Sequence, residues 1–93
     1  MNYSLELQSE AIIDIHEAFE WYQIKRKGLG FDLIEEIETG FKNICDHPQY
    51  YTQINSNFRR YKINRFPYLI IYEIEGDAVI INSVQHSSRK PKS

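Results

Sequence analysis

The chain opens with a short alternation of apolar and polar residues and then changes to a helical period. The alternation covers residues 3–7 and predicts a short strand with one buried face. From residue 9 the apolar positions recur three and four residues apart, and the expected buried stripe consists of Ile12, Ile15, Phe19 and Tyr22. After Gly28-Leu29-Gly30 a second stripe of the same period consists of Ile34, Ile37, Phe41 and Ile44. Two amphipathic helices with so short a connection are expected to fold back as an antiparallel hairpin.

The second half of the chain has the patterning of strands. Residues 59–63 alternate between charged and apolar side chains, residues 68–72 are apolar on both faces, and residues 78–84 are again largely apolar. Glu75-Gly76-Asp77 predicts a hairpin turn between the last two strands, whereas residues 49–57 predict a loop or a weak edge strand. The expected fold class is α+β, in the order β-α-α-β-β-β. One domain over residues 1–93 would consist of a curved antiparallel sheet with the helical hairpin packed on one face.

Composition narrows the classes of protein. The 93 residues are 42% hydrophobic and 26% charged, which is typical of a small globular domain. No run is long and apolar enough to span a membrane, and the N-terminus lacks the pattern of a signal peptide, so we expect a cytoplasmic protein. Cys45 is the only cysteine, and the three histidines are scattered, so we expect no disulfide within the chain, no metal site and no cofactor.

The small net charge of −2 hides an uneven distribution. Residues 1–48 contain four basic and ten acidic side chains, whereas residues 49–93 contain seven basic and three acidic ones. The candidate cations are Arg59, Arg60, Lys62 and Arg65 on or beside one strand, and Arg89 and Lys90 after the last strand, with His86 beside them. Two interpretations remain open. Either these side chains meet on one concave face and bind an anion, or they form a solvated strand face and a basic tail.

Three further residues have more than one interpretation. Trp21 lies beside the buried stripe of the first helix, where it either covers the edge of the sheet or contacts a partner. Gly40 lies inside the second helix, where a close approach by a neighbouring element would explain it. Cys45 has no basic neighbours in the sequence and is expected to be an inert thiol.

An ordered set of residues along nearly the whole chain resembles the RelE/ParE superfamily of bacterial toxins. The residues that carry this resemblance are Ala11, Asp14-Ile15, Ala18, Trp21-Tyr22, Gly28-Leu29-Gly30, Phe41, Ile44, Pro48, Arg60, Arg65-Phe66-Pro67-Tyr68, Tyr72 and His86-Ser87-Ser88-Arg89-Lys90-Pro91. The resemblance implies the toxin of a type II toxin–antitoxin module, which a cognate antitoxin protein neutralises. It leaves open a homodimer or a toxin–antitoxin heterotetramer.

The branches of this superfamily imply different activities. Resemblance to the ParE-like, plasmid-stabilisation branch implies a protein that inhibits growth by binding DNA gyrase and is not itself an enzyme. Resemblance to the RelE-like branch implies a metal-independent endoribonuclease that cuts mRNA on the ribosome. Its candidate catalytic residues would be Arg60, Arg65, His86 and Arg89.

The sequence favours the ParE-like branch. Leu69 stands where the RNA-cleaving branch has an arginine, and residues 47–57 contain no lysine. An inactive scaffold that only binds the antitoxin is a third alternative. The expected contacts with the target or the antitoxin are Trp21, Arg59, Lys62 and Lys90.

Overall fold

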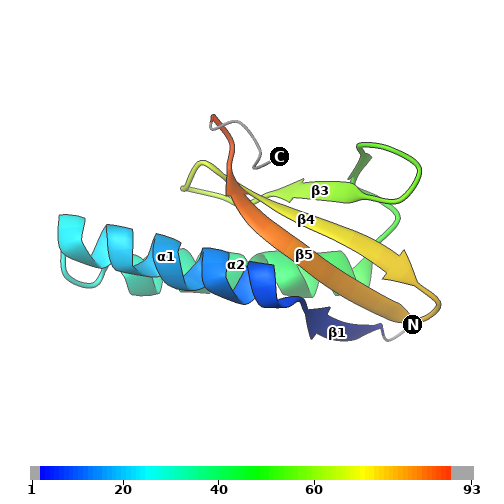
Figure 1. Cartoon of the computed structure of the whole chain (residues 1–93), viewed down its shortest axis with the longest axis horizontal. Coiled ribbons are helices and arrows are strands. Elements are labelled where there is room, and N and C mark those ends of the chain that lie inside the picture. Colours follow the sequence, from blue (N-terminus) through cyan, green and yellow to red (C-terminus); the bar gives the residue numbers. More distant parts are fainter. Residues whose placement is uncertain (1–2, 89–93) are drawn as a thin grey trace.

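The computed structural model describes residues 3–88, which form two helices and one five-stranded sheet. In chain order the elements are β1 (Ser4–Leu7), α1 (Ser9–Lys25), α2 (Leu29–Asp46), β2 (Thr52–Gln53), β3 (Arg59–Lys62), β4 (Tyr68–Glu75) and β5 (Ala78–His86). The strands lie in the order β1-β5-β4-β3-β2, and both helices lie side by side against one face of the sheet (Figure 1). The predicted α+β fold with a helical hairpin is therefore confirmed. We call the other sheet face the open face.

The sheet is mixed, which differs from the antiparallel sheet expected from the sequence. Strands β2 to β5 pair antiparallel, but β1 pairs parallel to β5, with Leu5 beside Val79. Strands joined by a tight turn must run antiparallel, whereas β1 reaches β5 only through the rest of the chain, so no turn fixes its direction. The two-residue strand β2 was expected as a loop or weak edge strand, and it pairs with β3 at the end of the sheet.

The core lies between the helices and the sheet, and α1 is rotated relative to the expected stripe. The largest fully buried side chains are Tyr72, Leu33, Ile37, Ile44, Ile63, Ile70, Ile81 and Val79. From α1 the buried residues are Ala11 and Ala18, whereas Ile12 is 55% exposed, so its placement in the buried stripe is wrong. Because the two alanines are small, α1 lies close to its neighbours and the larger Ile12 turns outward.

Gly40 allows α2 to approach the sheet closely. A Cβ atom at this position would lie 2.9 Å from Cδ1 of Ile70 and 2.9 Å from Cε1 of Tyr61. Real Cβ contacts are longer than this, so a side chain at residue 40 would force the Ile70 and Tyr61 side chains to move. The explanation by close approach is confirmed. Neither helix in residues 3–88 has the length and apolar character needed to cross a membrane.

Tyr72 connects the sheet to the end of α2 through a buried hydrogen bond. Its hydroxyl donates to the carbonyl oxygen of Pro48 at 2.6 Å, and its side chain is fully buried. Burial raises the pKa of Tyr72 from 10.0 to about 12, against a smaller lowering by Arg59. The neutral phenol is therefore the form that the fold stabilises.

We expect the fold to lose stability in alkaline solution because of Tyr72. Below pH 10 its contribution is complete. As the pH rises from 10 to about 12, the phenol ionises in the unfolded chain before it does so in the folded one. The free energy of unfolding should then fall by about 2–3 kcal/mol.

Urea unfolding at several pH values measures this effect. Tyr72→Phe should reduce the fall in the free energy of unfolding between pH 10 and 12. It should also lower the free energy of unfolding at pH 7 by about 1–3 kcal/mol, because the carbonyl of Pro48 loses its hydrogen-bond donor. Tyr50→Phe removes a phenol that is 81% exposed and serves as the control. An alkaline loss of the same size in Tyr72→Phe would contradict the assignment to Tyr72.

Candidate functional site

The predicted cations on β3 are divided between the two faces of the sheet. Tyr61 points toward the helices, where its ring lies against Gly40. Since side chains alternate along a strand, Arg59 shares that face, whereas Arg60 and Lys62 lie on the open face, and both are exposed. The first of the two interpretations, in which the predicted cations meet on one face, is therefore wrong for this strand.

Arg59 serves the fold. Its Nη1 atom donates to the carbonyl oxygen of Tyr51 at 2.8 Å and to that of Gln49 at 3.1 Å. The guanidinium thus holds the loop after α2 against β3, and its donors are directed at the chain's own backbone. Sequence reasoning missed this role because the acceptors are carbonyl groups, which no sequence pattern marks.

Arg65 lies in the connection between β3 and β4 and interacts with α2. Its Nη2 atom is 3.5 Å from a carboxylate oxygen of Asp32, and its Nη1 atom is 3.5 Å from one of Glu36. Its backbone has a φ of 73°, a left-handed conformation that is uncommon for a residue with a side chain. Two carboxylates therefore offset the charge of Arg65 and attach this connection to the helix.

His86 lies at the end of β5 on the face toward the helices. It pairs with Tyr68 in the register, and the two rings meet edge to face with centroids 5.2 Å apart. Tyr68 in turn contacts Tyr22 of α1. Arg60 and His86 are therefore on opposite faces of the sheet. Arg89 and Lys90 lie outside the described residues 3–88.

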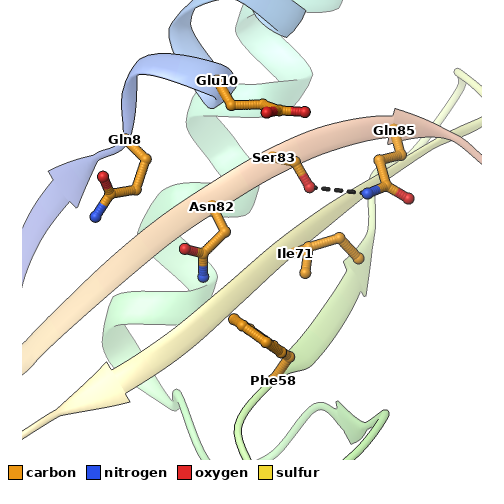
Figure 2. A pocket seen from close by; sticks show the side chains of 7 residues that line it. All are labelled: Gln8, Glu10, Phe58, Ile71, Asn82, Ser83 and Gln85. Atoms are coloured by element: carbon orange, nitrogen blue, oxygen red, sulfur yellow. Dashed lines mark hydrogen bonds between the residues drawn. The ribbon is translucent and has the colours of Figure 1, made fainter. Parts of the chain in front are cut away.

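A hollow lies on the open face, between the start of α1, strands β4 and β5, and the residue that precedes β3 (Figure 2). It has a volume of about 440 Å³ and is lined by Gln8, Glu10, Phe58, Ile71, Asn82, Ser83 and Gln85. A β-bulge in β5 shapes it, because Ile71 and Tyr72 pair with Ser83 and Ile81, which leaves Asn82 as the extra residue. Sequence reasoning missed this hollow, for which the polar pair Asn82-Ser83 inside an apolar strand was the available signal.

The outer surface of the hairpin carries large apolar side chains. Trp21 is 49% exposed, with Nζ of Lys25 4.5 Å from the centroid of its ring. About half of the Trp21 side chain is therefore open to a partner. Other exposed apolar side chains on the two helices are Ile12, Ile13, Ile24 and Phe31. We call these five residues the hairpin outer surface. The exposure of these side chains makes them candidates for a protein contact.

Within residues 3–88, neither the Cys45 thiol nor any cluster of metal-binding side chains forms a reactive site. Burial, together with Asp46, raises the pKa of the Cys45 thiol, so the thiol is protonated at neutral pH. Within residues 3–88, no three side chains of His, Cys, Asp or Glu gather where they could hold a metal ion. The candidate sites are therefore the hollow and the hairpin outer surface.

A comparison with models of known protein families identifies the family of this chain. Residues 5–91 match the family described as ParE toxin of the type II toxin–antitoxin system parDE. No curated protein matches the sequence. A structure of the chromosomal ParDE toxin–antitoxin system from P. aeruginosa has a TM-score of 0.80 and 15% identity, covering 90% of this chain and 95% of that chain.

Two structures from E. coli have the same fold. The isolated RelE toxin has a TM-score of 0.70 and 15% identity, covering 95% of this chain and 87% of that chain. A chain of the intact RelBE toxin–antitoxin complex has a TM-score of 0.69 and 15% identity, with coverages of 94% and 99%. At such low identity these similarities establish the fold alone.

Proposed function

Because this chain belongs to the ParE family of toxins from type II toxin–antitoxin systems, we propose that it inhibits growth by binding DNA gyrase. The family match over residues 5–91 carries this proposal. The chain acts by binding and catalyses no reaction of its own. Its cognate antitoxin neutralises it by covering the surface that it needs or by holding it away from its target.

The placement of the cations supports binding over RNA cleavage. A metal-independent ribonuclease needs a proton acceptor, a proton donor and cations around one phosphate. In this chain Arg60 and His86 lie on opposite faces of the sheet, and Arg65 is paired with carboxylates of α2. Three of the four residues predicted for cleavage are therefore not arranged around one phosphate, and Arg89 lies outside the described residues.

The hairpin outer surface is the proposed contact for the antitoxin. Its five apolar side chains are exposed, and glutamates such as Glu17 and Glu20 lie between them on α1. An amphipathic helix with apolar anchors and basic residues between them would complement this surface in both shape and charge. The antitoxin segment that binds here is therefore expected to be helical.

Expression of the chain alone in bacteria tests the proposed target. We expect growth arrest, accumulation of cleaved gyrase–DNA complexes and loss of supercoiling by purified gyrase on addition of the purified chain. Co-expression of the protein encoded beside it should restore growth. Cuts in mRNA at the ribosomal A site with intact gyrase activity would contradict the proposal, and so would normal growth at high expression.

Arg89→Ala is expected to reduce growth inhibition by about tenfold or more. The proposed function assigns this guanidinium to the contact with the target, and loss of a charged contact at an interface typically weakens binding by this amount. The measurement is the inducer concentration that halves the growth rate, with the folded state checked by circular dichroism. Lys92→Ala removes a charge three residues later and is the control. Unchanged inhibition by Arg89→Ala would remove Arg89 from the contact.

A further inference from the structure

The charges of the open face are separated along the strands. The strand register assigns to this face the charged residues Arg60 and Lys62 of β3, Glu73 and Glu75 of β4 and Glu6 of β1. On β3 the two cations pair with Ile71 and Leu69, in the first half of β4. The two glutamates of β4 occupy its second half, and Glu6 lies at the level of Glu73 because both pair with Ile80. One end of the open face is therefore basic and the other end is acidic.

The middle of the open face is apolar and uncovered. The side chains of Phe58, Leu69 and Ile71 lie there, and each is partly exposed. No helix in residues 3–88 covers this face (Figure 1). Within the same residues, none of the charged side chains that β3 and β4 present on this face forms an ion pair. Exposed apolar side chains beside unpaired charges are typical of a surface that binds another protein.

The open face is complementary to itself. Consider a two-fold axis that lies parallel to the sheet and crosses the strands at the level of Tyr72, so that it exchanges the two ends of the face. Arg60 lies at the level of the residue before Tyr72, and Glu73 is the residue after it. The rotation therefore sets Arg60 of one copy against Glu73 of the other, and in the same way it sets Lys62 against Glu75. Stacked sheets lie about 10 Å apart, a gap that two long charged side chains bridge together.

The other acids of the open face do not oppose one another across this axis. The rotation moves Glu6 to the level of Ile71, where β1 of the other copy has ended and the uncharged Gln8 follows. Glu10 is exposed at the rim of the hollow, where solvent and salt screen its charge. The opposite charges in the middle of the face therefore dominate.

We propose that two copies of this chain associate through their open faces about this axis. A second copy offers opposite charge to both ends of the face at once. A uniformly acidic partner would be repelled by Glu73 and Glu75, and a uniformly basic one by Arg60 and Lys62. The hollows of the two copies overlap across the axis, and their amide side chains, such as that of Asn82, can hold ordered water between the sheets.

The size of the open face sets the strength of this association. Strand β4 has eight residues and is about 27 Å long, and four strands span about 15 Å. The contact then buries roughly 400–500 Å² on each copy, which is at the low end for protein interfaces. We therefore expect a weak dimer with a dissociation constant in the micromolar range. The hairpin outer surface lies on the other side of the sheet and stays accessible in both copies.

Sedimentation velocity of the purified full chain at increasing concentration measures this association. The sedimentation coefficient should rise from the value of a monomer to that of a dimer, and added salt should shift the equilibrium toward the monomer. A chain that remains monomeric up to about 1 mM overturns the proposal.

Arg60→Glu tests the charge contact, because the new carboxylate opposes Glu73 of the other copy in both symmetric contacts. It should raise the dimer dissociation constant by about 100-fold. Lys42→Glu makes the same change in charge at an exposed position of α2 and is the control, with no expected effect. Circular dichroism checks the fold of each variant. Equal weakening by the two variants overturns the proposal, and so does an unchanged dimer in Arg60→Glu.

A mixture of two variants gives the sharpest test. Arg60→Glu and Glu73→Arg should each be monomeric when alone, because each sets like charges against one another. Mixed together they should form a one-to-one heterodimer, since both contacts then join opposite charges again. Absence of the heterodimer, with both variants folded, overturns the pairing of Arg60 with Glu73 and with it the proposal.

This proposal does not rest on the proposed function, and its failure can be distinguished. A dimer with the expected charge dependence in a chain that does not affect gyrase would contradict only the target. A monomeric chain that inhibits gyrase would contradict only the dimer. A monomeric chain in which Arg60→Glu abolishes antitoxin binding would assign the open face to the antitoxin and overturn the proposal.

Discussion

An Ile24→Glu variant is expected to inhibit growth even when its antitoxin is present. Ile24 is 85% exposed and lies near the end of α1, on the hairpin outer surface. A glutamate there removes an apolar anchor and adds a charge that a buried interface would have to desolvate. We expect the dissociation constant for the antitoxin to rise by about 30-fold or more. Because the side chain is almost fully exposed, the fold should be unaffected.

Calorimetry with the purified antitoxin measures this change, and growth under co-expression gives the cellular result. Thr39→Glu is the matched control, since it adds the same charge at an exposed position of α2, outside the hairpin outer surface. A combined Ile13→Glu and Ile24→Glu variant should weaken binding further, because both positions lie on the same side of α1. Full neutralisation of the double variant would place the antitoxin on another surface.

Gly30→Ala is expected to destabilise the fold by about 2–3 kcal/mol. A Cβ atom at Gly30 would lie 2.7 Å from the carbonyl oxygen of Phe19 and 2.6 Å from Cγ of Gln23. The first of these is a backbone atom of α1, so relief requires the two helices to separate. Separation would also weaken the bond at 2.9 Å in which Gly30 N donates to Oε1 of Gln23.

The sign of this effect makes the test decisive. In an exposed helix, replacement of glycine by alanine normally stabilises by about 0.5–1 kcal/mol. Thermal unfolding should show a lower midpoint for Gly30→Ala, by roughly 10–20 °C for a domain of this size. Thr39→Ala, at an exposed position of the same helix, should have little effect or a small stabilising one. A midpoint for Gly30→Ala equal to that of the unaltered chain would contradict the close helix contact.

The sequence predicted the helices and strands of this fold. It did not predict the direction of β1 or which side of α1 is buried. The order of helices and strands could be predicted because its signals are local. These signals are the helical and strand spacings of apolar residues, the turn at Gly76 and the long apolar segments. The direction of β1 could not be predicted, because it depends on a pairing with β5 that no turn controls. The rotation of α1 was also missed. Its apolar residues lie all round the helix, so packing of Ala11 and Ala18 decides which side is buried.

The candidate sites were harder to predict than the fold. The cations of the second half were found, but their distribution over two faces follows from alternation along β3, which the charge count ignores. Asp14 illustrates the same difficulty. Its carboxylate accepts a hydrogen bond at 3.0 Å from the backbone N–H of Val84. This N–H lies on the edge of β5, past the last residue that pairs with β1. The acceptor is visible in the sequence, whereas its backbone donor, 70 residues away, is not.

The pairing of β1 with β5 also bears on how a harmful protein is synthesised. Gln8 N donates to the carbonyl oxygen of Ile81, so the first strand can pair with its neighbour only after residue 81 has left the ribosome. Contacts of such wide sequence separation form late and slowly. A nascent chain therefore cannot complete its sheet before β5 has emerged from the ribosome.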